Sequence, residues 1–255
     1  MTVKIVLDEQ LIIPFGRPKW DINQIKVVGV SANATYLESS IPCVYINKKN
    51  KYPLRLTSFT SVFPVPDNGF PKINDASESL KYIREYIQYT CQLDTFWEKK
   101  FLDIYFEYCQ SQIPCYLASD IYIETYYTNC WFNALLPLPQ AHIYVGNPLD
   151  NKSSYLMPDK MCKIDFAFWT GNQIIAVEID GDGKQASNIV PRDRMLEEAG
   201  IQVIHILNSE IDKHGTKIID LLLPHPISSF LAPEYGFDGY CGINPLDNRL
   251  DEFFY

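Results

Sequence analysis

Residues 163–172 read KIDFAFWTGN and residues 173–180 read QIIAVEID, and these two runs decide the fold class. Both runs are rich in the β-branched and aromatic residues that favour strands. The turn residues Thr-Gly-Asn separate them at 170–172. The pattern therefore predicts a hairpin of two antiparallel strands, Lys163–Trp169 and Gln173–Ile179.

The continuation GDGKQASNIVPRDRMLEEAGIQVIHIL, residues 181–207, extends the hairpin into a crossover unit. A short helix is expected from Pro191 to Ala199, because proline is tolerated in a first helical turn and Gly200 is a typical stop. The apolar run Ile201–Leu207 then predicts a strand. A strand, a helix and a strand in this order place the second strand parallel to the first and largely buried.

The remainder of the chain divides into a β-rich region at 1–74, a core at 75–225 and a tail at 226–255. In the first region, prolines interrupt four β-rich runs, Lys4–Leu7, Ile25–Val30, Val44–Ile46 and Leu54–Phe63. The segment at 64–75 is rich in turn residues and is the expected boundary. The tail is aromatic and acidic and predicts no particular structure.

Helical periodicity follows the boundary. Apolar residues recur at helical spacing from Asp75 to about Cys109, and the length predicts two helices divided near Gln92–Asp94. Thr95 and Glu98 have the spacing of a capping box, which marks the start of the second helix. Further strands are expected at Ile121–Tyr127 and Ala141–Val145.

The composition is that of a folded protein. The chain has 255 residues, of which 47% are hydrophobic, 14% aromatic and 21% charged, which excludes a disordered or collagen-like chain. No apolar run approaches the roughly 20 residues of a membrane span, and no signal peptide is apparent. The seven cysteines form no C-x-x-C pair, which favours a reducing compartment, so we expect a cytoplasmic protein with no membrane partner.

The formal net charge of −9 counts against a general nucleic-acid coat protein, whose affinity comes mainly from lysine and arginine. It does not exclude an enzyme that acts on nucleic acid. Such a site concentrates carboxylates for metal binding and can keep its basic residues on one face of the molecule.

Acidic residues gather in the hairpin. Side chains alternate along a strand, so Glu178 and Asp180 project from one face, and Asp165 on the partner strand can lie opposite them. Converging carboxylates repel one another unless a cation or protons intervene. The pattern indicates a site for Mg²⁺ or Mn²⁺, and the alternative is a pair of solvated acids at the strand ends.

This arrangement of an Asp, a hairpin, Glu-x-acid-Gly, a helix opening Arg-Asp-x-x-Leu and a strand Val-Ile-x-Ile resembles the PD-(D/E)XK, or restriction-endonuclease-like, nuclease superfamily. It looks closest to the branch of very-short-patch-repair-type nucleases, over roughly residues 90–210. The resemblance implies an α/β fold with a mixed sheet flanked by helices and a β-rich N-terminal extension. It also implies metal-dependent hydrolysis of phosphodiester bonds, with DNA as the expected substrate.

The resemblance assigns roles to individual residues. Asp165 and Glu178 match the acidic metal ligands, and Glu98 matches a glutamate in the helix ahead of the sheet. Glu98 and Asp180 are expected as further metal ligands or as residues that position the attacking water. The capping box alone also accounts for Glu98. Gln140, in Pro-Gln-Ala-His-Ile, matches a glutamine that often lines the site, although it also fits a simple turn residue.

The chain departs from the superfamily at one position, because Asp180 stands where a lysine usually follows the second acid by two residues. Lys163 and Lys184 are the candidates for a replacement that orients the attacking water or stabilises the developing charge. Without a replacement, catalysis is in doubt.

Basic residues suggest where phosphates bind. Arg192 and Arg194 open the helix beside the acids and can reach a phosphate or pair with Asp193, Glu197 and Glu198. A second cluster comprises Lys48, Lys49 and Lys51, for which a solvated turn is the alternative.

Other chemistries lack support. The chain has no P-loop, no G-x-G-x-x-G and no G-x-S-x-G motif, and its four histidines have no metal-ligand spacing. Asp180-Gly-Asp182 begins like an EF-hand loop, but Pro191 stands at its twelfth position. Two alternatives to the DNA nuclease remain open: an RNA-directed nuclease, and an inactive nuclease-like module that binds nucleic acid or a protein partner. Double-strand cleavage by the superfamily often uses two subunits, so the resemblance is also compatible with a homodimer.

Overall fold

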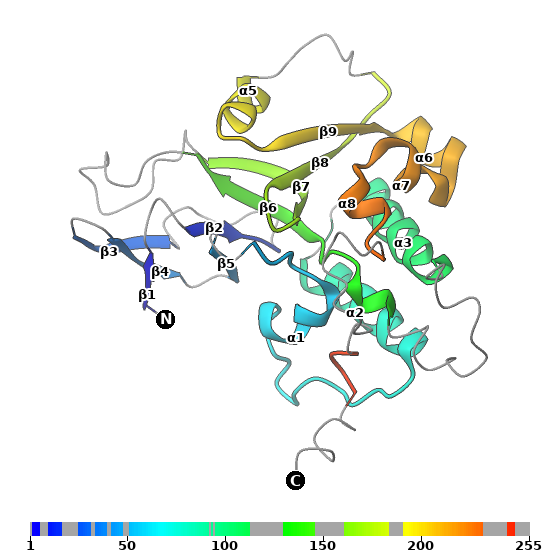
Figure 1. Cartoon of the computed structure of the whole chain (residues 1–255), viewed down its shortest axis with the longest axis horizontal. Coiled ribbons are helices and arrows are strands. Elements are labelled where there is room, and N and C mark those ends of the chain that lie inside the picture. Colours follow the sequence, from blue (N-terminus) through cyan, green and yellow to red (C-terminus); the bar gives the residue numbers. More distant parts are fainter. Residues whose placement is uncertain are drawn as a thin grey trace.

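The computed structural model describes residues 2–5, 10–16, 25–31, 34–39, 42–47, 51–91, 93, 95–112, 130–145, 161–183, 191–231 and 244–247. In these residues the chain is a mixed α/β protein with a four-stranded mixed sheet and several helices (Figure 1). The predicted strand at Ile121–Tyr127 lies outside the described residues. No helix in the described part of the chain has the length and apolar character needed to cross a membrane.

The four-stranded sheet has the order β6-β7-β8-β9. Its strands are β6 (Leu138–Tyr144), β7 (Met161–Trp169), β8 (Ile174–Asp180) and β9 (Gln202–Leu207). The first two pairs are antiparallel and the β8–β9 pair is parallel. The predicted hairpin, the crossover and the parallel strand are therefore confirmed.

The expectation that the strand after the crossover is largely buried is wrong. Along β9, Gln202 and His205 are exposed and Ile206 is buried. The reason is position, since β9 is the last strand in the order and pairs with β8 alone within the sheet. An apolar run predicts a strand, but it does not say where in the sheet the strand lies.

Helices cover both faces of this sheet. On one face lies α3 (Phe96–Ser111), where Phe101 packs against Phe166 with ring centroids 5.0 Å apart. The other face carries α5 (Pro191–Glu198), whose Arg192 reaches Glu178. Side chains alternate along β7 and β8, so the aromatic face and the acidic face are opposite sides of the same strands.

The helical predictions also hold. Two helices, α2 (Ala76–Cys91) and α3, fill the periodic stretch and divide where expected. The Thr95 side chain accepts a hydrogen bond from the Glu98 backbone N–H at 3.1 Å, which confirms the cap. The helix α5 ends at Glu198, and Gly200 follows with a φ of 78°, in the left-handed region that glycine adopts without strain.

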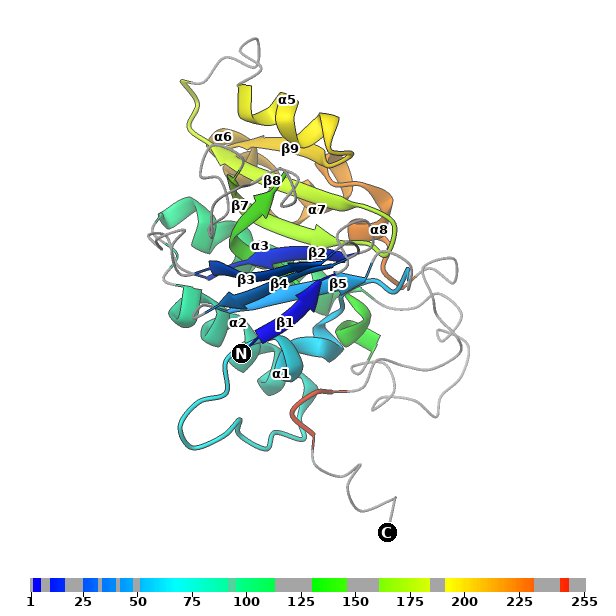
Figure 2. The same cartoon turned by 90° about the vertical axis from the view of Figure 1, so that its left-hand side faces the viewer.

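The N-terminal region forms two small antiparallel sheets. One has the order β1-β4-β3, from β1 (Thr2–Ile5), β3 (Ile25–Ser31) and β4 (Ala34–Ser39), and the other pairs β2 (Gln10–Pro14) with β5 (Cys43–Asn47). Strands β2 and β4 were not expected from the sequence. Strand β2 lies against β6 of the central sheet (Figure 2), and the Gly16 N–H donates to the Pro139 carbonyl oxygen at 3.0 Å.

The predicted strand Leu54–Phe63 is wrong. The segment forms a 3₁₀ turn, η2 (Leu56–Ser58), followed by α1 (Phe59–Val62). Its buried side chains are Leu56, Phe59 and Phe63, which recur at helical spacing, so the 3.6-residue period outweighs the β propensity of the individual residues. The Leu56 N–H donates a hydrogen bond to the carbonyl oxygen of Ala134. Ala134 directly follows the 3₁₀ turn η4 (Cys130–Asn133).

The C-terminal elements pack along α3. They are α6 (Asn208–His214), η7 (Gly215–Lys217), α7 (Ile218–Leu222) and α8 (His225–Ser228). The Tyr108 hydroxyl of α3 contacts the Asp220 carboxylate and the Ser228 carbonyl oxygen. Part of the tail also joins the core, because Leu246 is buried and its carbonyl oxygen accepts from the Ile73 N–H.

Candidate functional site

The strand registers align one polar residue from each strand of the central sheet. Glu178 pairs with His205 across β8 and β9. Phe166 pairs with Val177, which puts the preceding Asp165 in register with Glu178. In the β6–β7 pair, the flanking partners put Gln140 in register with Asp165. A transverse row of polar residues therefore crosses the sheet.

Asp165 and Glu178 form the centre of this row. The Asp165 carboxylate accepts a hydrogen bond from the Ile179 N–H at 2.8 Å. Burial raises the pKa of Asp165, and the Ile179 N–H and the charges of Lys163 and Arg192 oppose that rise.

Glu178 is 5% exposed, and its pKa is raised to about 8, first by burial and then by the charge of Asp165, with Arg192 acting in the opposite direction. A second ionised carboxylate beside the first is therefore unfavourable at neutral pH unless a proton or a cation compensates it.

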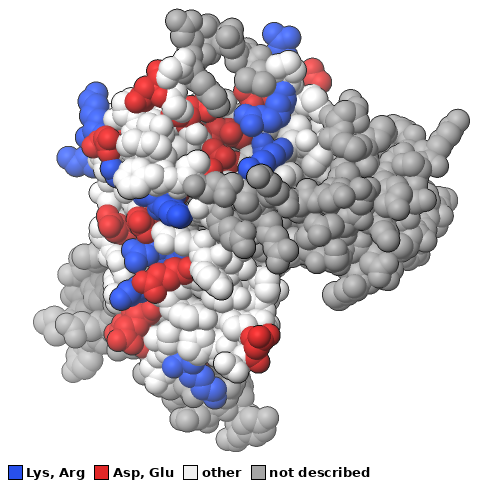
Figure 3. Space-filling model, turned by 180° about the vertical axis from the view of Figure 1, so that it is seen from behind, with Lys and Arg blue, Asp and Glu red and all other residues white. Residues whose placement is uncertain are grey.

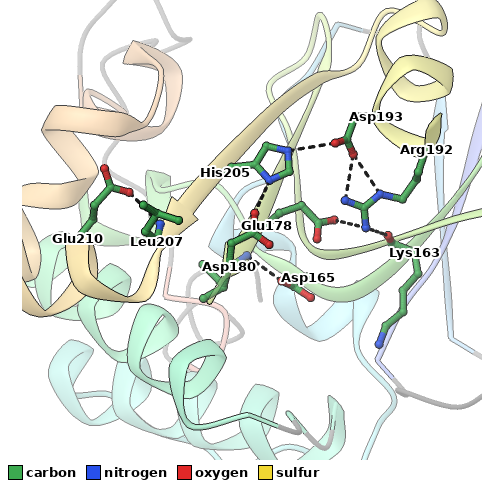
Figure 4. A network of polar contacts seen from close by, with 10 residues as sticks. Lys163, Asp165, Glu178, Asp180, Arg192, Asp193, His205, Leu207 and Glu210 are labelled. Atoms are coloured by element: carbon green, nitrogen blue, oxygen red, sulfur yellow. Dashed lines mark hydrogen bonds and ion pairs between the residues drawn. The ribbon is translucent and has the colours of Figure 1, made fainter. Parts of the chain in front are cut away.

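Arg192, at the start of α5, is a cation in contact with Glu178 (Figure 4). Its Nη1 lies 3.2 Å from Glu178 Oε1 and donates to the Lys163 carbonyl oxygen at 3.2 Å. Its Nε and Nη2 donate to one oxygen of Asp193, at 3.1 and 3.0 Å. The expected pairing of Arg192 with Asp193 on its own helix is confirmed, and Arg192 also contacts Glu178. Its contact with a phosphate stays a prediction.

Asp180 is engaged by His205. His205 Nδ1 lies 2.6 Å from Asp180 Oδ2, and His205 Nε2 lies 3.3 Å from Asp193 Oδ2 (Figure 4). The imidazole thus bridges two buried carboxylates. A continuous chain of contacts runs from Asp180 through His205, Asp193 and Arg192 to Glu178.

Glu98 and Gln140 lie beside the pair and are under-satisfied. Gln140 is fully buried, and neither atom of its amide group has a hydrogen-bond partner of good geometry. Glu98 is also buried, and its Oε2 has none either. Burial and then the charge of Asp165 raise the pKa of Glu98, while the Thr95 backbone, Gln140 and Lys163 lower it.

Gln140 has a φ of 50°, in the left-handed region that non-glycine residues rarely adopt. Backbone strain of this kind persists only where the surroundings impose it, and it is common at functional sites.

Lys163 borders the site, and the remaining predicted residues lie elsewhere or outside the described part. The Lys163 amine points away from Glu178 (Figure 4), but its charge acts on Asp165 and Glu98. Arg194 is exposed on α5. The Lys51 backbone packs on Gly171 at the hairpin turn, roughly 20 Å along the strand from the acids. Lys48, Lys49 and Lys184 lie outside the described residues.

The side chains of the site suit an ion that keeps several of its waters better than an ion bound entirely by protein ligands. Within the described residues, no three His, Cys, Asp or Glu side chains are placed to hold one ion together. Two adjacent carboxylates remain, Asp165 and Glu178, and Glu178 Oε1 is buried with Arg192 Nη1 at 3.2 Å but without a hydrogen bond of good geometry. Mg²⁺ commonly binds through one or two carboxylates and keeps several waters, so the pair suits that ion.

The excess of acidic over basic groups at the site also favours a bound cation. The contact chain and Asp165 hold four carboxyl groups, from Asp165, Glu178, Asp180 and Asp193, against the charges of two nearby cations, Arg192 and Lys163. Acidic and basic side chains lie side by side on the upper part of the face in Figure 3, so no broad basic surface forms among its described residues. The local excess of negative charge favours a cation.

Sequence reasoning missed His205 and the supporting role of Asp193. A polar residue inside the apolar run IQVIHIL was the available signal, because a histidine in an otherwise apolar strand needs a partner. Its partner could not be identified without the parallel register of β8 and β9.

Comparisons of the chain with protein-family models, with curated proteins and with solved structures find no match.

Proposed function

We propose that the chain is a metal-dependent nuclease of PD-(D/E)XK type, with DNA as its first expected substrate. The observation that carries the proposal is the buried pair Asp165 and Glu178, which lie in register on neighbouring strands and in which the charge of Asp165 raises the pKa of Glu178. A mixed sheet with helices on both faces is compatible with the restriction-endonuclease-like core.

Hydrolysis adds one water across a P–O bond. The water oxygen bonds to phosphorus, the bond to the leaving oxygen breaks, and a proton passes from the water to the leaving oxygen by way of solvent. A bound Mg²⁺ would lower the pKa of a coordinated water and neutralise phosphate charge.

Each residue of the site has a role in this reaction. Asp165 and Glu178 would hold the ion, and Glu98 and Gln140 border the same point with unsatisfied polar atoms. Those atoms are suited to orienting water.

The test is a cleavage assay on the purified full chain. Supercoiled plasmid, single-stranded DNA and RNA are incubated with Mg²⁺, Mn²⁺ or EDTA. We expect cleavage with a divalent ion that falls by at least about 100-fold in Asp165→Asn and Glu178→Gln. The matched control is Glu107→Gln, at an exposed glutamate of α3, which should retain activity. Full activity in either site variant would refute the assignment, and the preferred polymer separates the DNA reading from the RNA reading.

A non-catalytic nuclease-like module is the second candidate. It is favoured by Asp180, which occupies the usual lysine position and contacts His205. This candidate predicts that the chain binds no Mn²⁺ in calorimetry and cleaves none of the three polymers, while it retains binding to one of them or to a protein partner.

A further inference from the structure

The position that usually supplies a lysine is occupied by Asp180, so the proposed site needs its positive charge from elsewhere. Of the two lysines considered from the sequence, Lys184 lies outside the described residues. Lys163 directs its amine away from Glu178 (Figure 4), and its charge acts on Asp165. Arg192 comes from the other direction, from the first turn of α5, and places Nη1 3.2 Å from Glu178 Oε1.

The guanidinium of Arg192 contacts three groups: the carboxylates of Glu178 and Asp193 and the carbonyl oxygen of Lys163. Asp193 accepts from Nε and Nη2, and the Lys163 carbonyl oxygen accepts from Nη1. The Asp193 carboxylate is in turn fixed by His205. A side chain with so many contacts has few accessible rotamers, so its direction toward Glu178 is set before any substrate binds.

The same guanidinium still has capacity for a ligand. Arginine carries five N–H donors, and the contacts above involve Nε, Nη1 and one donor of Nη2. The side chain is 30% exposed, so it is reachable from solvent. A planar guanidinium with a free N–H beside a carboxylate pair is well suited to a phosphate oxygen.

We infer that Arg192 supplies the positive charge that faces the scissile phosphate, and that Asp193 is the residue that positions it. The inference rests on the proposed nuclease function. Arginine stays protonated throughout the accessible pH range, so its role is to stabilise negative charge that develops on the phosphate oxygens, and it transfers no proton. Asp180 then acts at a distance, because His205 joins it to Asp193.

The first experiment separates this role from metal binding. The purified full chain is compared with Arg192→Gln, by kcat and KM for the best substrate and by Mn²⁺ calorimetry. We expect kcat to fall by about 100-fold or more. The Mn²⁺ dissociation constant should stay within about threefold or decrease, because the neighbouring positive charge is gone. Lys213→Gln, at an exposed cation of α6, is the matched control and should change neither value.

Chemical rescue gives a second readout. Arg192→Ala removes a partly exposed guanidinium and leaves a space open to solvent. Added guanidinium chloride, at concentrations too low to unfold the protein, should restore cleavage several-fold, and sodium chloride at equal ionic strength should not. Arg192→Lys keeps one positive charge but loses the two hydrogen bonds from Nε and Nη2 to Asp193. Its cleavage rate should therefore lie between those of wild type and Arg192→Gln.

The positioning role has its own test. Asp193→Asn keeps an acceptor oxygen for Arg192 but removes the charge, so kcat should fall about 5- to 20-fold while KM stays near its wild-type value. A change in KM alone would contradict the positioning role.

The outcomes separate this inference from the proposed function. If wild type cleaves and Arg192→Gln cleaves equally well, Arg192 has no such role and the nuclease assignment stands. If Arg192→Gln loses Mn²⁺ binding or its folded circular-dichroism spectrum, Arg192 is a structural anchor and the inference is overturned. If wild type neither binds Mn²⁺ nor cleaves, the proposed function fails and the inference fails with it.

Discussion

Asp165 and Glu178 lie in register on neighbouring strands, and after burial the charge of Asp165 is the largest cause that raises the pKa of Glu178 to about 8. The two residues are thirteen positions apart in the sequence, across the turn of one hairpin. A buried like-charged pair destabilises the folded chain when no cation is present, which makes the pair measurable without any substrate.

Removing one member of the pair should stabilise the metal-free protein at high pH. Glu178 binds its proton more tightly in the folded chain than in the unfolded one, so stability falls as pH rises from about 4.5 to about 8. Glu178→Gln should abolish this fall. The free energy of unfolding of Glu178→Gln should equal that of wild type below pH 4.5. At pH 9 it should be higher by at most roughly 5 kcal/mol.

Urea unfolding in EDTA at pH 4.5, 7 and 9 measures that difference. The exposed Glu107→Gln serves as the control and should follow wild type at every pH. Parallel pH profiles for wild type and Glu178→Gln would show that the two carboxyl groups do not interact as described.

Divalent binding should depend on pH through the same proton. Below pH 8 an ion must displace the proton held by Glu178, so the affinity for Mg²⁺ should rise by up to about tenfold per pH unit and level off above pH 8. Thermal unfolding of wild type with Mg²⁺ at pH 6, 7, 8 and 9 reports this, because a ligand at about 100 times its dissociation constant adds roughly 2.7 kcal/mol. The Mg²⁺-induced shift should be small in Glu178→Gln at all four values, and an equal shift in that variant would place the ion elsewhere.

Gln140→Met should raise stability and lower activity. Gln140 is fully buried and both of its amide atoms lack a well-formed hydrogen bond, so an apolar side chain of similar size removes an uncompensated polar group. We expect a gain of about 1–3 kcal/mol in the free energy of unfolding, together with slower cleavage. Gln112→Met, at the half-exposed end of α3, should change stability by less than about 0.5 kcal/mol. A loss of stability in Gln140→Met would mean that the amide has partners in solution.

Gly171→Ala should weaken the contact between the N-terminal region and the central hairpin. Gly171 has a φ of 95°, and a Cβ there would lie 2.3 Å from the Lys51 carbonyl oxygen. The neighbouring contacts include a hydrogen bond of 2.8 Å from Trp169 Nε1 to the Tyr52 carbonyl oxygen. The backbone at 51–52 has to shift, which should cost about 2–4 kcal/mol.

Gly69→Ala is the matched control for that substitution. Gly69 also has a positive φ, of 77°, but a Cβ there meets nothing within 4 Å. Its cost should therefore be about 1 kcal/mol, from backbone strain alone. Urea unfolding measures both losses of stability. Equal losses in the two variants would mean that the close approach of Lys51 to Gly171 does not affect the free energy of unfolding.

The local elements were the predictable part of the fold. The hairpin around Thr-Gly-Asn at 170–172, the cap at Thr95 and the helix that stops at Gly200 all depend on residues within a few positions of one another. The exceptions show how such reasoning fails. Leu54–Phe63 has strand-like composition, but burial of Leu56, Phe59 and Phe63 against the core selects a helical turn.

The candidate site was predictable only in part. Asp165, Glu178 and Glu98 were identified from the residues and a resemblance, and the structure brings them close enough that the charge of Asp165 raises the pKa of both glutamates. The role of His205 was not predictable, because it depends on which residue of β9 pairs with Glu178. Nothing in the spacing of 178 and 205 specifies that register.

The amino-acid sequence by itself determined the secondary structure of the central unit and the alternation that puts Glu178 and Asp180 on one face. Both follow from local periodicity and turn chemistry, which act over a few residues. Only the tertiary structure decided that Asp180 contacts His205 and that Arg192, not Lys163, contacts Glu178. Those choices depend on strand register and on where α5 packs, and both result from burying the whole apolar core at once, not from any single segment.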